Sequence, residues 1–134
     1  MSLVRRLFDE AVNQGHVDLI VELYAPSFVD HSPGPGQAPG PAGIIEGVKR
    51  YRTAIPDLEV TVEDVIVSGD RVVTRETWSG THRYELAGLA ATNRSFVTTR
   101  MHIFRVDSGR VVEEWSAGNV LDLLRTIEAE DDSA

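Results

Sequence analysis

The sequence contains no cysteine, which excludes disulfide bonds, a thiolate nucleophile and a cysteine-ligated zinc site. Positive charge is scarce, because 13 Lys and Arg residues stand against 21 Asp and Glu residues and the net charge is −8. Nucleic-acid binding needs clustered basic residues, so this balance argues against it. No unbroken apolar run could form a signal peptide or a membrane span. A cytoplasmic protein without a membrane partner is the default expectation.

Motifs for cofactors and nucleophiles are also missing. The sequence has no G-x-G-x-x-G, no phosphate-binding loop and no G-x-S-x-G. Its four histidines form neither an H-x-x-x-H nor an H-x-H pair, which argues against a metal site. The sequence therefore predicts neither a metal ion nor a cofactor.

What is present fits a single domain, residues 1–134, with an acidic tail (128–134) that we expect to fray. Apolar residues recur at helical spacing in 3–12, 17–24, 44–55 and 120–127, and alternate as in strands in 58–67, 72–82, 95–106 and 110–119. Helices come first and antiparallel strands follow. This order predicts an α+β fold with three N-terminal helices over a curved, mostly antiparallel sheet and a short C-terminal helix.

Two local features refine this prediction. The alternation changes phase near residues 63–64, which predicts a β-bulge that bends the strand. Segment 33–43 is dominated by Gly and Pro, and its place next to His31 predicts a mobile rim over a cavity.

The strand 95–106 is apolar on both faces. Phe96 and Phe104 share one parity, and Val97, Met101 and Ile103 share the other. A sheet with one face in water alternates more cleanly, so both faces are expected to be covered. We predict that helices cover one face and that a second copy of the chain covers the other, in a homodimer.

Several side chains could carry chemistry. In the stretch RVVEEWSAGN two adjacent carboxylates precede Trp115, and in the strand 72–82 Trp78 shares parity with Glu76 and His82. Each tryptophan could equally be a core residue. His102, in the middle of the strand 95–106, could be a half-buried structural histidine. Glu114 could be half of a cross-strand ion pair with an arginine.

The segments GPAGIIEG, PDLEV, SGDRVV, SGTH, ATNR and MHIFRVDSGRVVEEW resemble the SnoaL-like polyketide cyclases. These belong to the nuclear-transport-factor-2-like superfamily, whose fold is a cone-shaped, cystatin-like α+β barrel. The resemblance covers residues 24–124. It implies a cofactor-free intramolecular aldol closure of an aromatic polyketide by acid/base catalysis in an apolar pocket, although the same fold hosts hydroxylases, isomerases and binding proteins.

The sequence departs from the family at two important positions. Members commonly carry a catalytic aspartate just after the tryptophan of the last strand and another aspartate three residues later, where this chain has Ser116 and Asn119. Neither side chain is an acid or base near neutral pH. Two hypotheses follow: a polyketide cyclase or related hydroxylase or isomerase, and a non-catalytic protein that binds a hydrophobic small molecule or serves as an accessory subunit.

The predicted site consists of three candidate catalytic residues and six substrate-binding residues. His102 is the expected proton carrier, oriented by Glu114, which could also supply a second proton site. The third candidate catalytic residue is Asn119. The predicted substrate-binding residues are His31, Tyr51, Trp78, His82, Trp115 and Ser116.

Overall fold

The computed structural model describes residues 2–133. The helical segments are α1 (Ser2–Arg6), the π-helical turn η1 (Leu7–Val12), α2 (Asp18–Leu23), α3 (Pro41–Ala54) and α4 (Val120–Ser133). The strands are β1 (Tyr24–Asp30), β2 (Glu59–Ser68), β3 (Arg71–Thr81), β4 (Ser95–Asp107) and β5 (Arg110–Ala117). The predicted α+β class is confirmed, but the expected order of helices first and strands after has one exception, because β1 lies between α2 and α3 in the chain.

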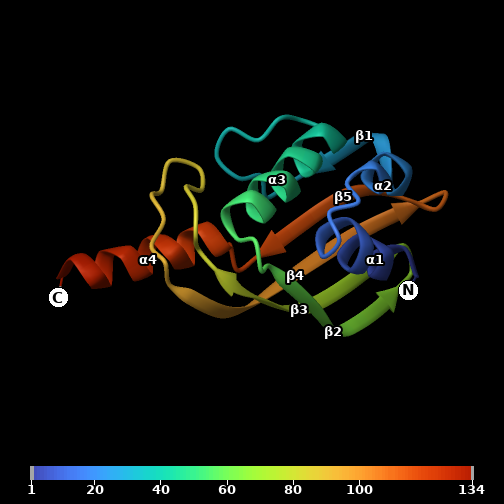
Figure 1. The fold of residues 1–134 in the computed structure, drawn as a ribbon. Helices are drawn as coiled ribbons and strands as arrows, with labels where there is room; N and C mark the ends of the chain where they lie inside the picture. The colour runs from blue at the N-terminus through green and yellow to red at the C-terminus, as the bar shows by residue number, and fades with distance from the viewer. Residues whose placement is uncertain (1, 134) are drawn as a thin grey trace.

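The five strands form one curved, open sheet in the order β1-β5-β4-β3-β2. β1 pairs with β5 in parallel, and the other neighbours are antiparallel. Figure 1 shows α1, α2 and α3 together over one face of this sheet, with the two termini at opposite ends of the molecule. We call the helix-covered face the inner face and the opposite one the outer face.

The core lies between the inner face and the helices. Phe8, Ile20 and Ile55 reach it from the helical side, and Phe104 and Val111 reach it from the sheet, all with at most 2% of their surface exposed. Burial of side chains of this size is the main favourable contribution to folding.

The predicted bulge is confirmed, because the β2–β3 register shifts between Val62 and Asp64. Hairpin turns join β2 to β3 and β4 to β5, and in each a glycine has a positive φ, 59° at Gly69 and 77° at Gly109. These turns and the bulge fix the register that places polar side chains on the inner face.

The bounds of α3 and α4 differ from the prediction. α3 begins at Pro41, so Gly43 lies in its first turn and not in the loop. A Cβ there would come within 2.0 Å of the Ala38 carbonyl oxygen, so only glycine fits. α4 continues to Ser133 and includes most of the tail that we expected to fray. None of the helices in residues 2–133 has the length and apolar character needed to cross a membrane.

Candidate active site

A cavity of about 150 Å³ lies between the helices and the inner face of the sheet. Its wall is largely apolar, with Phe8 from η1, Val48 from α3 and Phe104 from β4. Polar side chains also line it: Tyr24, Asp30, Ser32, Gln37, Glu46, Arg50, Tyr51, Arg100, His102, Glu114, Ser116 and Asn119. An apolar cavity with a few convergent polar groups is the usual form of a small-molecule site.

His102 is held in place by a buried carboxylate on the neighbouring strand. Its Nδ1 lies 2.7 Å from Oε1 of Glu76, which is 0% exposed. The same carboxylate accepts hydrogen bonds from the Trp78 indole N–H at 3.1 Å and from the Thr74 hydroxyl at 2.7 Å. The imidazole also stacks on Phe104 with ring centroids 5.4 Å apart. With Nδ1 engaged by Glu76, Nε2 is the ring nitrogen left for chemistry in the cavity.

Glu114 provides a second acid/base group in the same cavity. It is 6% exposed, and its Oε1 accepts a hydrogen bond of 2.6 Å from the Tyr24 hydroxyl. Burial raises the pKa of Glu114, and the nearby His102 and the Tyr24 hydrogen bond oppose this effect only in part. Burial likewise raises the pKa of Tyr24 well above its ordinary value. Glu114 is therefore suited to hold a proton in the cavity and to donate it.

Aromatic side chains and an arginine form another part of the wall. Tyr51 packs edge-to-face on Trp78 at a centroid distance of 6.0 Å. The Arg100 guanidinium carbon lies 4.6 Å from the centre of the Trp78 ring. Burial raises the pKa of Tyr51, and the positive charge of Arg100 opposes that shift.

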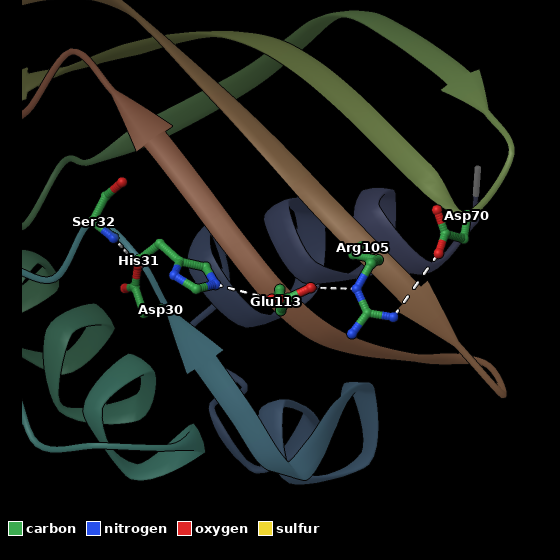
Figure 2. A network of polar contacts seen from close by, with 6 residues as sticks. All are labelled: Asp30, His31, Ser32, Asp70, Arg105 and Glu113. Atoms are coloured by element: carbon green, nitrogen blue, oxygen red, sulfur yellow. Dashed lines mark hydrogen bonds and ion pairs between the residues drawn. The ribbon is translucent and has the colours of Figure 1, made fainter.

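The segment between β1 and α3 closes one side of the cavity through Gly34, Pro35 and Gln37. Asp30, at the end of β1, anchors this segment. One of its carboxylate oxygens accepts a 2.9 Å hydrogen bond from the Ser32 backbone N–H, drawn in Figure 2, and the other accepts one of 2.9 Å from the Gln37 side chain. The segment thus lies at the cavity as expected, and its mobility stays a prediction.

The structure brings six of the nine predicted site residues to the cavity: Tyr51, Trp78, His102, Glu114, Ser116 and Asn119. Asn119 has an additional role there. Its side-chain oxygen accepts hydrogen bonds from the backbone N–H groups of Leu121 at 2.7 Å and Asp122 at 3.3 Å, which caps the start of α4. The expected partnership of His102 with Glu114 is replaced by the contact with Glu76.

Trp115 and His31 lie on the outer face, which corrects their predicted place in the cavity. Glu114 and Ser116 point inward, so Trp115 between them points outward, since side chains alternate along a strand. His31 stacks on Trp115 with a centroid distance of 4.7 Å and an interplanar angle of 12°. Figure 2 shows His31 beside Glu113, with 3.0 Å between Nε2 and Oε1, and Glu113 paired in turn with Arg105.

His82 is buried and does not line the cavity, which is a second correction. It follows the last residue of β3, so the strand parity that linked it to Trp78 no longer applies. Its Nδ1 accepts the backbone N–H of Thr92 at 3.2 Å, and burial lowers the pKa of its imidazole. These contacts suit a residue that holds the loop between β3 and β4.

The site residues that were not predicted include Glu76, Tyr24 and Arg100. An acid inside the alternating strand 72–82 was a signal for Glu76, because its parity with Trp78 already placed it on the same face. Tyr24 had no such signal, since its contact with Glu114 joins residues 90 positions apart.

Comparison with known proteins finds sequences and structures similar to this chain. The family model for SnoaL-like polyketide cyclases matches residues 2–127. TsrD from Streptomyces laurentii is 27% identical, with 92% of this chain and 90% of that chain covered and a TM-score of 0.81. IdmH from Streptomyces antibioticus, described as a candidate polyketide cyclase, is 30% identical, with coverage of 95% and 96% and a TM-score of 0.78. AclR from Streptomyces galilaeus, a candidate hydroxylase, is 25% identical, with coverage of 96% and 94% and a TM-score of 0.78. A comparison with curated protein sequences finds no match.

Proposed function

Because this chain belongs to the SnoaL-like polyketide cyclase family, we propose that it catalyses a cofactor-free intramolecular aldol closure of an aromatic polyketide. The single observation that carries the proposal is the meeting of two proton-transfer groups in one apolar cavity: His102, held by Glu76, and Glu114, whose pKa is raised by burial. A reaction of this kind needs one group to remove a proton and another to return one.

In the proposed reaction, Nε2 of His102 takes a proton from a carbon flanked by two carbonyl groups. The resulting enolate carbon attacks a ketone carbon of the same molecule, so a C–C bond forms and the electron pair of the C=O bond moves to its oxygen. Glu114 gives its proton to that oxygen. A proton then passes from His102 back to Glu114, which restores both groups, and the product is an isomer of the substrate.

The roles follow from the environments of the two groups. Glu76 accepts from Nδ1 of His102, which fixes the imidazole tautomer with Nε2 available as a base. Glu114 is buried and keeps its proton at a higher pH than an exposed carboxyl group, which suits a general acid. Glu114 thereby supplies the acid for which the family commonly has an aspartate at the Ser116 position.

The test is turnover of polyketide intermediates from a minimal aromatic polyketide synthase, followed as a change of chromophore at constant mass. His102→Asn keeps a donor for Glu76 but cannot carry a proton, and we expect the rate to fall about 10²–10⁴-fold. His16→Ala, at an exposed position, is the matched control and should leave the rate unchanged. Equal turnover by His102→Asn and the native chain would contradict the proposal.

A second candidate function is non-catalytic binding of a hydrophobic small molecule. The observation that favours it is the absence of an acid at Ser116 and at Asn119, whose side chain caps α4. In that case the native chain would bind an aromatic ligand in the cavity without converting it. Ligand binding and turnover, measured on the same compounds, separate the two functions.

We further propose that the protein acts in the biosynthesis of an aromatic polyketide antibiotic, as a homodimer formed through the outer face. The outer face exposes Val97 by 75%, Met101 by 46% and Ile103 by 36%, which supports a partner there. A cytoplasmic location stays a prediction.

A further inference from the structure

Arg100 is a buried cation that forms no ion pair within residues 2–133, and its charge acts on the Glu114 carboxyl only from beyond ion-pair distance, where it opposes the rise of the Glu114 pKa. The residue is 9% exposed, and its fully buried Nε has no hydrogen-bond partner. The nearest register position across the sheet belongs to Glu76, but the oxygens of that carboxylate accept from Thr74, Trp78 and His102. The guanidinium therefore meets an aromatic ring, Trp78, in place of a counter-ion.

A buried charge without a partner is costly, and proteins usually pair such a group or bring it to a ligand. Arg100 lines the cavity, so its guanidinium group can meet a molecule bound there. A guanidinium offers several N–H donors in a planar fork that matches two oxygens of one delocalised anion. Neutral ligands would leave the charge uncompensated.

The backbone around Arg100 supports a fixed position for this group. Gly118, just after β5, has φ 86°, and a Cβ there would lie 2.5 Å from the Thr99 carbonyl oxygen and 3.4 Å from Cγ of Arg100. Only glycine allows this close approach between the end of β5 and β4. Trp78 and Gly118 thus bound the Arg100 side chain on two sides.

We propose that Arg100 is the recognition group for a delocalised oxyanion of the ligand, either a carboxylate or the enolate of a β-dicarbonyl group. The inference rests on the proposed function in that it names the class of molecule the same cavity takes. It predicts that this protein selects anionic aromatic or polyketide substrates over their neutral esters. In the enolate case, Arg100 holds the oxygen on which negative charge collects after proton removal.

Binding of small probes to the full chain tests this, with benzoate, methyl benzoate and the enolate of cyclohexane-1,3-dione titrated up to millimolar concentrations at pH 7.5 by calorimetry and by thermal shift. We expect benzoate or the enolate to bind about 10- to 100-fold more tightly than the neutral ester, the scale of one hydrogen-bonded charge. Benzoate alone would identify the carboxylate as the source of the anion, and the enolate alone would identify the β-dicarbonyl.

Arg100→Met should remove this preference by weakening anion binding, and Arg100→Lys should restore part of it, because the charge returns without the fork. Arg75→Met is the matched control, since Arg75 is exposed and paired with Asp64. If the Arg100→Met chain does not fold, the test rests on the preference of the native chain for anionic probes and on how much Arg100→Lys weakens that preference.

Equal affinity of the native chain for benzoate, enolate and ester, or no binding of any anion, would overturn the inference. So would unchanged anion binding in Arg100→Met. These outcomes are distinct from failure of the proposed function. An anion preference without turnover of any polyketide would refute catalysis alone, and turnover indifferent to Arg100→Met would refute the anion site alone.

Discussion

The carboxylate of Glu76 lies 2.7 Å from Nδ1 of His102, and the two residues come from adjacent strands, β3 and β4. Glu76 has no contact with the cavity itself and acts through His102 as a positioning residue. The pair resembles a histidine and its orienting acid in other acid/base sites, where the acid sets the tautomer and the direction of the ring. Glu76, and not the predicted Glu114, performs this role.

Glu76→Gln should lower turnover about 10²–10⁴-fold, because the amide can present only one acceptor oxygen to three donors and disturbs the His102 tautomer. The free energy of unfolding should fall by about 1–3 kcal/mol, the cost of a mismatched buried hydrogen bond. Glu113→Gln is the matched control, since Glu113 lies on the outer face. A pH–rate profile should shift for Glu76→Gln only. An unchanged profile would show that Glu76 is purely structural.

Glu114→Gln should change how stability depends on pH. The pKa of Glu114 is raised in the folded state, so the folded chain binds more protons than the unfolded chain above about pH 4.3, the unfolded value. The stabilisation present below that pH is lost as pH rises through the folded pKa. Denaturant unfolding from pH 4 to 8 should show Glu114→Gln equal to the native chain at pH 4 and more stable at pH 8.

The control for this experiment should show the opposite dependence of stability on pH. Arg105 and His31 lower the pKa of Glu113, so its contribution is present above the unfolded pKa and is lost as pH falls. Glu113→Gln should therefore be less stable than the native chain at neutral pH, and this difference should disappear as the pH falls. If Glu114→Gln behaved like Glu113→Gln, the assignment of Glu114 as a buried acid would be wrong.

The sequence could predict the fold and several of the polar residues that line the cavity, because side chains alternate along strands. Parity alone places Trp78 and Glu76 on one face, and Glu114 and Ser116 on one face. The same rule should have excluded Trp115, because neighbours in a strand cannot both enter one cavity. The family resemblance had suggested a site around that tryptophan, and its neighbours Glu114 and Ser116 do line the cavity, but the Trp115 side chain itself points to the outer face.

Contacts between distant segments could not be predicted. Which acid contacts His102 depends on strand register. In the β3–β4 pairing Thr74 lies directly opposite His102, and Glu76 is the next residue of β3 on the same face of the sheet. Likewise, the lack of a partner at Arg100 is a property of the packed inner face and has no trace in composition or periodicity.

Asn119→Ala should cost about 1 kcal/mol of unfolding free energy, because the oxygen that caps α4 is lost. Asn119→Asp keeps the acceptor and places a negative charge at a helix N-terminus, so its stability should equal or exceed that of the native chain. Thermal unfolding in low salt measures both. Equal stability of Asn119→Ala and Asn119→Asp would contradict the capping role.

Met101→Glu should weaken the proposed homodimer by placing a charge on the outer face, where Met101 is 46% exposed. Sedimentation at micromolar concentration should show a dimer for the native chain and a monomer for this variant. Val21→Glu, at a 60% exposed position on α2, is the matched control and should remain dimeric. A native chain that sediments as a monomer would refute the dimer and leave the apolar outer face without a partner.

Ser116→Asp should rescue turnover in a chain that carries Glu114→Gln. Ser116 lines the cavity two residues from Glu114 on the same face of β5 and is the register partner of His102 across the β4–β5 ladder. An aspartate there would supply a proton at the position where the family commonly has one.

We expect the double variant to recover at least about 10-fold of the rate lost in Glu114→Gln, within the range that one general acid contributes. Ala117→Asp in the same background is the matched control, because Ala117 is exposed and pairs with Met101 toward the outer face. Rescue by Ser116→Asp alone would show that the acid can act from either position on the inner face. Equal rates for the two double variants, with both chains folded, would contradict the prediction and show that an acid at position 116 cannot replace Glu114.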